Sequence, residues 1–163
     1  MNYMSTPAIA PIAFLLANGF EESNYAQAQK TIIKNGLETK VVAAETAVVN
    51  GWDGQGWGCF FPIDEPLNKA LAYDFSGLVI PGNKRSVEKM LKTAHSRRFI
   101  EGFLTAGKPI LCVGDTSVYT ELLSGYEAHA ESILYAHEDN LAEMLSTFTS
   151  ALKVDELDIA DAA

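Results

Sequence analysis

The chain has 163 residues, of which 48% are apolar and 20% charged, and its formal net charge is −9. This length suits one domain that buries a core without disulfides. Twelve basic against 21 acidic residues exclude a generic nucleic-acid binder, because the phosphate backbone would repel the chain. No apolar run reaches the roughly 18 residues of a membrane span. No basic residue precedes the apolar run 8–17, as a signal peptide requires. We expect a soluble cytoplasmic protein that binds neither nucleic acid nor membrane.

The first 44 residues have the pattern of a strand, a helix and a second strand. Residues 9–17 form an unbroken apolar run, which is typical of a strand buried on both faces of a parallel sheet. A helix is predicted over 23–35, and Gly36 suits the residue after it, where a left-handed backbone is needed. A second strand is predicted over 37–44. Together these elements form a βαβ unit.

Residues 48–62 interrupt this alternation. The segment NGWDGQGWG holds four glycines and both tryptophans, Trp52 and Trp57, and predicts a small hairpin or flap near 47–61. Aromatic side chains on such a loop often mark a contact surface. Three interpretations stay open: a subunit interface, a lid over a ligand, or packing of the tryptophans against the domain's own core.

Helices and strands continue to alternate through the rest of the chain. In order, we expect helix 66–73, strand 76–80, helices 86–94 and 96–106, strand 110–113, helix 116–124, strand 131–135 and helix 140–152. This alternation predicts a flavodoxin-like three-layer α/β sandwich with a mostly parallel central sheet. A single domain is expected over 9–152, with flexible ends at 1–8 and 153–163.

Three loops follow parallel strands and should meet at one edge of the sheet. They are 18–24, 81–85 and 114–117, and ligands of such sheets bind at the edge where the strands end. No flavin is expected, because 18–24 lacks a Ser/Thr-rich phosphate cradle, and no other cofactor is predicted. The predicted pocket consists of residues from these loops: Glu21, Glu22, Asn24, Gly82, Asn83, Gly114, Asp115 and Thr116.

The same three loops carry a resemblance to a known family. LLANGFEES resembles the first strand and turn of the PfpI-like intracellular proteases, which belong with the parkinsonism-associated deglycases to the class I glutamine amidotransferase-like superfamily. DFSGLVIPGN and GKPILCVGD resemble that family's Val-Ile-Pro-Gly-Gly segment and its nucleophile elbow. The resemblance covers Ile9–Leu152 and implies a flavodoxin-like fold and a homodimer.

The resemblance also implies that the family's catalytic pair is missing here. The cysteine nucleophile of the family falls on Gly114, and its activating glutamate falls on Asn24. A glycine carries no nucleophile, and an amide cannot share a proton with a thiol. Lys-Pro-Ile before a Gly-Asp elbow further resembles the C-terminal flavodoxin-like domain of large-subunit catalases, which also lacks the cysteine. The chain has no room for the haem-binding catalase barrel.

Two classes of function stay open at this point. The first is a non-catalytic, pseudoenzyme-like module that binds a small molecule or a partner, which Gly114 and Asn24 favour. The second is a glyoxalase, deglycase or peptidase whose catalytic residues differ from those of the family. They would be either Cys112 or the carboxylates of Glu21, Glu22 and Asp115.

Each candidate residue also has a structural interpretation. Cys112 is expected as an inert core residue, and the alternative is a nucleophile. Asp115 is expected to cap the helix after it, although a cap can also face a ligand. Glu21 and Glu22 would stabilise the start of a helix or, together with Asp115, serve acid–base chemistry or a divalent metal.

Lys84 and Arg85 begin a basic run, 84–98, in which six lysines and arginines are opposed by Glu88 alone. The run predicts either a solvated helix face or, at Lys84 and Arg85, a site for a small anionic ligand beside a helix N-terminus. The two cysteines lie near none of the three histidines in sequence and form no CxxC motif. No zinc site is therefore predicted, and no metal is assigned beyond the alternative named for the loop carboxylates.

Overall fold

A computed structural model describes residues 9–152, and a sheet of six parallel strands runs through its centre. The strands are, in spatial order, β6 (Glu65–Pro66), β3 (Thr39–Ala43), β1 (Ile12–Leu15), β7 (Gly77–Pro81), β8 (Ile110–Val113) and β9 (Ile133–Ala136). Without the short β6, the order is second, first, third, fourth, fifth, which is that of flavodoxin. The predicted flexible ends, 1–8 and 153–163, lie outside the described residues.

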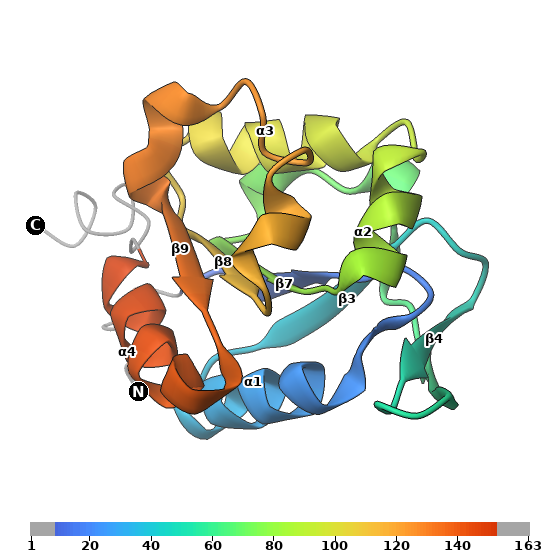
Figure 1. The fold of residues 1–163 in the computed structure, drawn as a ribbon. Coiled ribbons are helices and arrows are strands. Elements are labelled where there is room, and N and C mark those ends of the chain that lie inside the picture. Colours follow the sequence, from blue (N-terminus) through green and yellow to red (C-terminus); the bar gives the residue numbers. More distant parts are fainter. Residues whose placement is uncertain (1–8, 153–163) are drawn as a thin grey trace, which may run out of the picture.

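Helices cover both faces of this sheet. Figure 1 shows α1 (Glu22–Lys34) and α4 (Leu141–Ala151) below the sheet, and α2 (Lys84–Leu91) and α3 (Ser96–Thr105) above it. Successive residues of a strand point to opposite faces. Phe14 of β1 therefore lies in the core between the sheet and helices α1 and α4, and Leu15 lies in the core between the sheet and helices α2 and α3. The predicted three-layer α/β sandwich is confirmed.

A second, smaller sheet stands beside the first at the ends of its strands. It consists of β2 (Phe20–Glu21), β4 (Val48–Trp52) and β5 (Trp57–Pro62), and β4 and β5 form the antiparallel hairpin predicted near 47–61. Figure 1 shows β4 projecting to the right of the main body. The hairpin is held to the domain by aromatic contacts, since the Phe61 ring lies 5.5 Å from Phe20 and 5.2 Å from Tyr25.

The prediction of one helix over 66–73 is wrong. Two three-residue 3₁₀ helices replace it, η1 (Leu67–Lys69) and η2 (Ala72–Asp74). Arg98 donates to two backbone carbonyls of this segment, and Lys108 donates to three carbonyls in and just after η2. These long-range bonds occupy carbonyl oxygens that a continuous α-helix would use itself. They also give Arg98 an anchoring role that the expected solvated basic face did not include.

The helix predicted over 116–124 is also shorter than expected. Only the 3₁₀ helix η3 (Thr116–Tyr119) forms, and turns follow it. The segment is rich in residues that are poor helix formers. The remaining short elements are η4 (Glu127–Ser132) and η5 (Glu138–Asn140). Within residues 9–152, none of the helices is long and apolar enough to cross a bilayer.

Candidate functional site

The elbow after β8 is a sharp turn built on Gly114. Its φ angle is +120°, which side-chain-bearing residues rarely adopt, and its N–H donates to the carbonyl of Ala136 at 2.8 Å. A Cβ at this position would lie 3.0 Å from the carbonyl oxygen of Gly82. The backbone of the elbow is therefore fixed between the ends of β7 and β9, with no side chain of its own.

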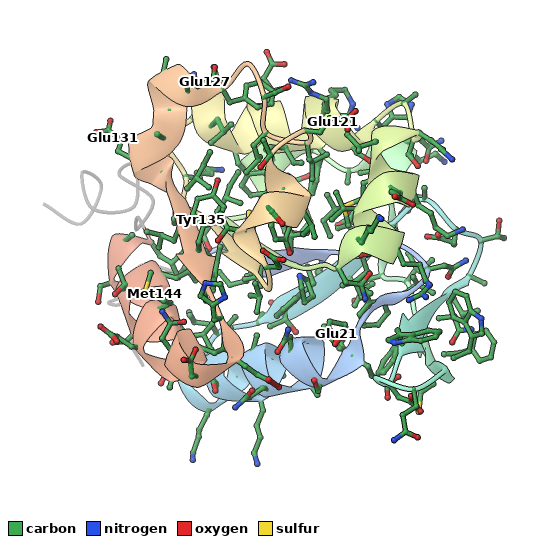
Figure 2. The ribbon with its side chains drawn as sticks, viewed as in Figure 1. Glu21, Glu121, Glu127, Glu131, Tyr135 and Met144 are labelled. Carbon is green, nitrogen blue, oxygen red and sulfur yellow. The ribbon has the colours of Figure 1, made fainter. Side chains whose placement is uncertain are left out.

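An open depression of about 460 Å³ lies beside this elbow. Its walls come from the start of α1, from the elbow and from the loop that follows β9, and Figure 2 shows Glu21 at the α1 side. The lining residues are Glu21, Asn24, Gly114, Asp115, His137, Glu138 and Asp139. The structure thus brings together four of the eight residues predicted for the pocket.

Asn24 is the buried polar residue of this group. It occupies the third position of α1 and is only 7% exposed. Its Oδ1 is buried, and no group within the described part of the chain donates a hydrogen bond to it. A buried acceptor without a donor is costly, so this oxygen needs a partner.

Asp115 caps η3, as the sequence predicted. Its Oδ1 accepts from the backbone N–H of Ser117 at 3.1 Å. This bond is the main cause that lowers the pKa of the Asp115 carboxyl, and the Ser117 hydroxyl and the charge of His137 lower it further. The carboxylate is exposed and also lines the depression, so the cap and the ligand-facing role are compatible.

Glu21 and Glu22 diverge, which corrects the expectation of a carboxylate group made of both and Asp115. Glu21 stays at the depression and accepts from Nδ2 of Asn83 at 3.2 Å. Glu22 turns to the hairpin and accepts from the backbone N–H of Cys59 at 2.9 Å. A Cβ at Gly51 would lie 2.7 Å from the Glu22 carboxylate and 3.2 Å from the Phe20 ring, so the space beside Gly51 is already occupied. Within residues 9–152, no three His, Cys, Asp or Glu side chains converge to hold a metal ion.

The second predicted loop has mainly structural contacts. Asn83 caps α2 by accepting from the N–H of Ser86 at 3.0 Å, and it donates to the carbonyl of Gly19 at 2.6 Å. Gly82 is buried, and its N–H donates to the hydroxyl of Tyr119 at 2.8 Å. Thr116 is exposed and lies outside the lining of the depression.

Lys84 and Arg85 line a separate hollow of about 370 Å³. The carboxylates of Glu21 and Glu88 line the same hollow, so its two cations face two acids. The guanidinium of Arg85 stacks on the ring of Trp52 at 3.7 Å. An anionic ligand at this place stays a prediction.

The two tryptophans are in different situations. Trp52 is partly covered by Arg85 and meets the Trp57 ring edge to face, with ring centroids 5.7 Å apart. Trp57 remains 54% exposed, and Phe60 on the same strand is 66% exposed. Trp52 thus packs against its own domain, whereas β5 presents an aromatic surface to the outside.

Cys112 lies in the core under α2 and α3 and is fully buried. Burial raises the pKa of its thiol, so the thiol stays protonated at neutral pH. The expected core position is confirmed. Cys59, in contrast, is exposed on β5.

His137, Glu138 and Asp139 form one wall of the depression and were not predicted from the sequence. A usable signal was present, because they come just after the strand predicted over 131–135 and therefore belong to the same edge as the other three loops. Tyr119 was not predicted either, and its hydroxyl lies 2.6 Å from the carbonyl oxygen of Val113 and 2.8 Å from that of Ile80. This side chain ties the ends of β7 and β8 together behind the elbow.

A flavodoxin-like sheet with an elbow after its fourth long strand defines the class of protein. The model of the DJ-1/PfpI family matches residues 10–128. The chain belongs to this family, as its three motifs predicted. The narrower likeness to the C-terminal domain of large-subunit catalases stays a prediction. A comparison with curated proteins gave no match.

Solved structures of the same superfamily share the fold. Oxidized DJ-1 of Toxoplasma gondii is 16% identical with a TM-score of 0.71, and the match covers 93% of this chain and 95% of that chain. A ThiJ/PfpI domain protein of Brachyspira murdochii is 16% identical with a TM-score of 0.69, and the match covers 88% and 96%. A two-domain Anabaena variabilis protein with DJ-1/ThiJ/PfpI-like and ferritin-like domains is 18% identical with a TM-score of 0.70, covering 86% and 47%.

Proposed function

We propose that this chain is a non-catalytic domain of the DJ-1/PfpI family that binds a small molecule or a partner at the depression beside Gly114. One observation carries the proposal. The position that the resemblance assigns to the cysteine nucleophile is a glycine with a φ of +120°, and the glutamate position is Asn24 on the same depression. This pair offers neither a nucleophile nor a group that would activate one.

Neither cysteine of the chain offers a replacement nucleophile at this place. Cys112 lies inside β8 with its thiol buried and its pKa raised, so a thiolate is not formed there at neutral pH. Cys59 lies on the hairpin and is not part of the lining of the depression. Both thiols are free, which suits a cytoplasmic protein.

A second candidate function rests on His137. This side chain lines the depression with Asp115 and Glu21, and its charge contributes to the lowered pKa of Asp115. A histidine beside carboxylates is a common arrangement for general acid–base catalysis. The alternative function is therefore a glyoxalase, deglycase or peptidase that activates water without a cysteine.

Consumption of methylglyoxal by the purified protein separates the two functions. The wild-type chain and variants Cys112→Ser and His137→Ala are compared with buffer alone. The binding-domain proposal expects the buffer rate from all three proteins. Turnover by the wild type that is lost in His137→Ala would support the acid–base enzyme, and loss in Cys112→Ser would place the chemistry on the thiol.

We further propose that the domain forms a homodimer through the outer face of the hairpin. Val48, Trp57 and Phe60 are 41%, 54% and 66% exposed on adjacent strands, which is unusual for large apolar side chains. Aromatic side chains gathered in this way are typical of subunit contacts.

A further inference from the structure

The outer edge of β9 directs backbone groups away from the central sheet. β9 is the last strand in the order of the sheet, and within residues 9–152 it pairs with β8 alone (Figure 1). The carbonyl of Ala136 accepts from the N–H of Gly114 at 2.8 Å, so Ala136 and, two residues earlier, Leu134 direct their backbone groups to β8. The backbone groups of Ile133 and Tyr135 therefore point outward.

Three of these four outward groups can bond to a further strand. The N–H of Ile133 is already used, because it donates to the carbonyl of Ala130 at the end of η4. The C=O of Ile133 and both backbone groups of Tyr135 have no partner among residues 9–152, and Tyr135 is 36% exposed. An edge with such groups is a template for the addition of a strand from another chain.

The opposite edge of the same sheet is protected. β6 has two residues, and the second, Pro66, has no N–H to donate. The first, Glu65, lies 3.9 Å from the ammonium group of Lys40. Proline and charged side chains are usual devices that keep a sheet edge from pairing. β9 contains neither proline nor a charged residue, so these devices do not protect it.

A hollow of about 230 Å³, which we call the β9 hollow, lies beside this edge. Ile133 and Tyr135 both line it, since alternate residues of a strand share a face. Its other lining residues are Thr120, Leu123, Tyr126, Glu127 and Ala130. The side chains of an added strand would lie next to those of Ile133 and Tyr135. The volume is below the range of about 300–1,000 Å³ that is usual for small-molecule pockets, and it suits one large apolar side chain.

The surroundings of the β9 hollow are acidic. Residues 120–135 include no lysine or arginine and three exposed glutamates, Glu121, Glu127 and Glu131. Figure 2 shows Glu127 and Glu131 above Tyr135. Arg97, beside them, stacks on the ring of Tyr126 at 4.8 Å and donates to a backbone carbonyl, so its charge is already engaged. A cationic segment is complementary to this surface.

Charge also distinguishes between the possible occupants of the edge. A second copy of the chain would bring a net charge of −9 and the same glutamates. Residues 154–163 of the chain itself contain four acids and no base. Like charges brought together oppose both of these occupants, so the surface fits a basic partner best.

We propose that the edge of β9 binds an extended segment of another protein, rich in lysine or arginine, as an added strand. Tyr135 exchanges backbone hydrogen bonds with this segment, and one large apolar side chain of the segment enters the β9 hollow. Its basic side chains lie near Glu127 and Glu131. The inference goes beyond the proposed function, because the β9 hollow shares no lining residue with the depression beside Gly114.

The test measures binding of a fluorescent peptide, Lys-Arg-Val-Leu-Val-Arg-Lys, to the full-length chain by anisotropy and by the backbone amide signals of ¹⁵N-labelled protein. One control peptide has glutamate at every basic position, and another has alanine in place of leucine. Two further peptides carry N-methyl groups on alternate residues, in the two possible registers, which removes the backbone donors along one side of the strand.

The proposal expects saturable binding of the basic peptide, with shifts at Glu127, Leu134 and Tyr135. The acidic peptide should not bind. Alanine in place of leucine should weaken binding about tenfold or more, because the apolar side chain is lost. One N-methylated register should lose binding and the other should keep it, since only one side of an added strand faces β9.

Variants of the protein test the same contacts from the other side. Tyr135→Pro removes the outward N–H, which an edge strand tolerates, and should weaken binding about tenfold. Tyr135→Ala loses the ring but keeps the N–H and should weaken binding less. Glu127→Gln and Glu131→Gln should each weaken it about two- to fivefold. The matched control is Glu38→Gln, an exposed acid before β3, which three strands separate from β9, and it should leave binding unchanged.

Three results would overturn the inference. The first is the absence of saturable binding at millimolar concentrations of the basic peptide. The second is equal affinity for the basic and acidic peptides or for the two N-methylated registers. The third is slow hydrogen exchange of the Tyr135 amide in the free chain, because a second copy or residues 153–163 would then already cover the edge. The N-methylated peptides keep the test decisive should Tyr135→Pro fail to fold.

Discussion

Gly114 is the residue on which the account of the elbow depends. A side chain here would have to adopt a φ of +120° and would place its Cβ 3.0 Å from the carbonyl oxygen of Gly82. Backbone strain of this kind costs about 1–3 kcal/mol. We expect Gly114→Ala to lower the free energy of unfolding by about that amount in urea denaturation.

The matched control for this change is Gly56→Ala. A Cβ at Gly56 meets no atom within 4 Å, and its φ lies outside the left-handed region. Its effect should stay within about 0.5 kcal/mol, as for an ordinary surface substitution. Equal losses in the two variants would show that the elbow is not strained.

The two cysteines should differ sharply in reactivity. Cys59 is exposed, whereas Cys112 is fully buried and the pKa of its thiol is raised by desolvation. Because the thiolate is the reacting species, a maleimide added at neutral pH should label one thiol per native chain and two per unfolded chain. Mass spectrometry of peptides identifies the labelled residue. Rapid native labelling of Cys112 would contradict its core position and reopen the nucleophile hypothesis.

Among the structural elements, η3 has the most specific role, because it carries Tyr119. The hydroxyl of Tyr119 accepts from the N–H of Gly82 at 2.8 Å and lies within 2.8 Å of two strand-end carbonyls. Tyr119→Phe would leave the buried Gly82 N–H without its partner, which costs about 1–3 kcal/mol. Thermal or urea unfolding measures this loss.

Tyr73→Phe is the control for the tyrosine prediction. Tyr73 is 85% exposed, so loss of its hydroxyl should change the free energy of unfolding by less than about 0.5 kcal/mol. If Tyr119→Phe were equally neutral, the ends of β7 and β8 would not depend on this hydroxyl.

The elements that the sequence predicted well are those with a strong local signal. β1, β7 and β8 are unbroken apolar runs, and Gly36 after α1 has the predicted left-handed backbone with a φ of +83°. The helices over 66–73 and 116–124 were predicted wrongly. The first segment is shaped by donors from Arg98 and Lys108, which lie more than 25 residues away in sequence. No local pattern contains such contacts.

For the whole molecule, parallel strands made four of the seven lining residues of the candidate site predictable. Strand ends meet at one edge, so Glu21, Asn24, Gly114 and Asp115 were expected together and do line one depression. The direction of a side chain was not predictable in the same way. Glu22 follows Glu21 in sequence, yet it bonds to the hairpin, because that contact depends on where β5 lies.

The quaternary structure gives a prediction at the same scale. If the outer face of the hairpin joins two copies, Phe60→Asp should weaken dimerisation about tenfold or more, as loss of a central aromatic contact does. Sedimentation velocity at several concentrations measures the effect. Tyr73→Asp, at another exposed aromatic residue, should leave the dimer intact. A wild-type chain that stays monomeric at high concentration would contradict the proposed interface.

The central claim is that the depression beside Gly114 binds a small molecule or a partner and catalyses no reaction. Its most direct test compares methylglyoxal loss by the wild type and by the variants Glu21→Gln and Asp115→Asn with the loss in buffer alone. All three proteins are first checked for folding by circular dichroism. The account predicts that the wild type consumes methylglyoxal no faster than buffer. Wild-type turnover that falls in Glu21→Gln and Asp115→Asn would contradict it.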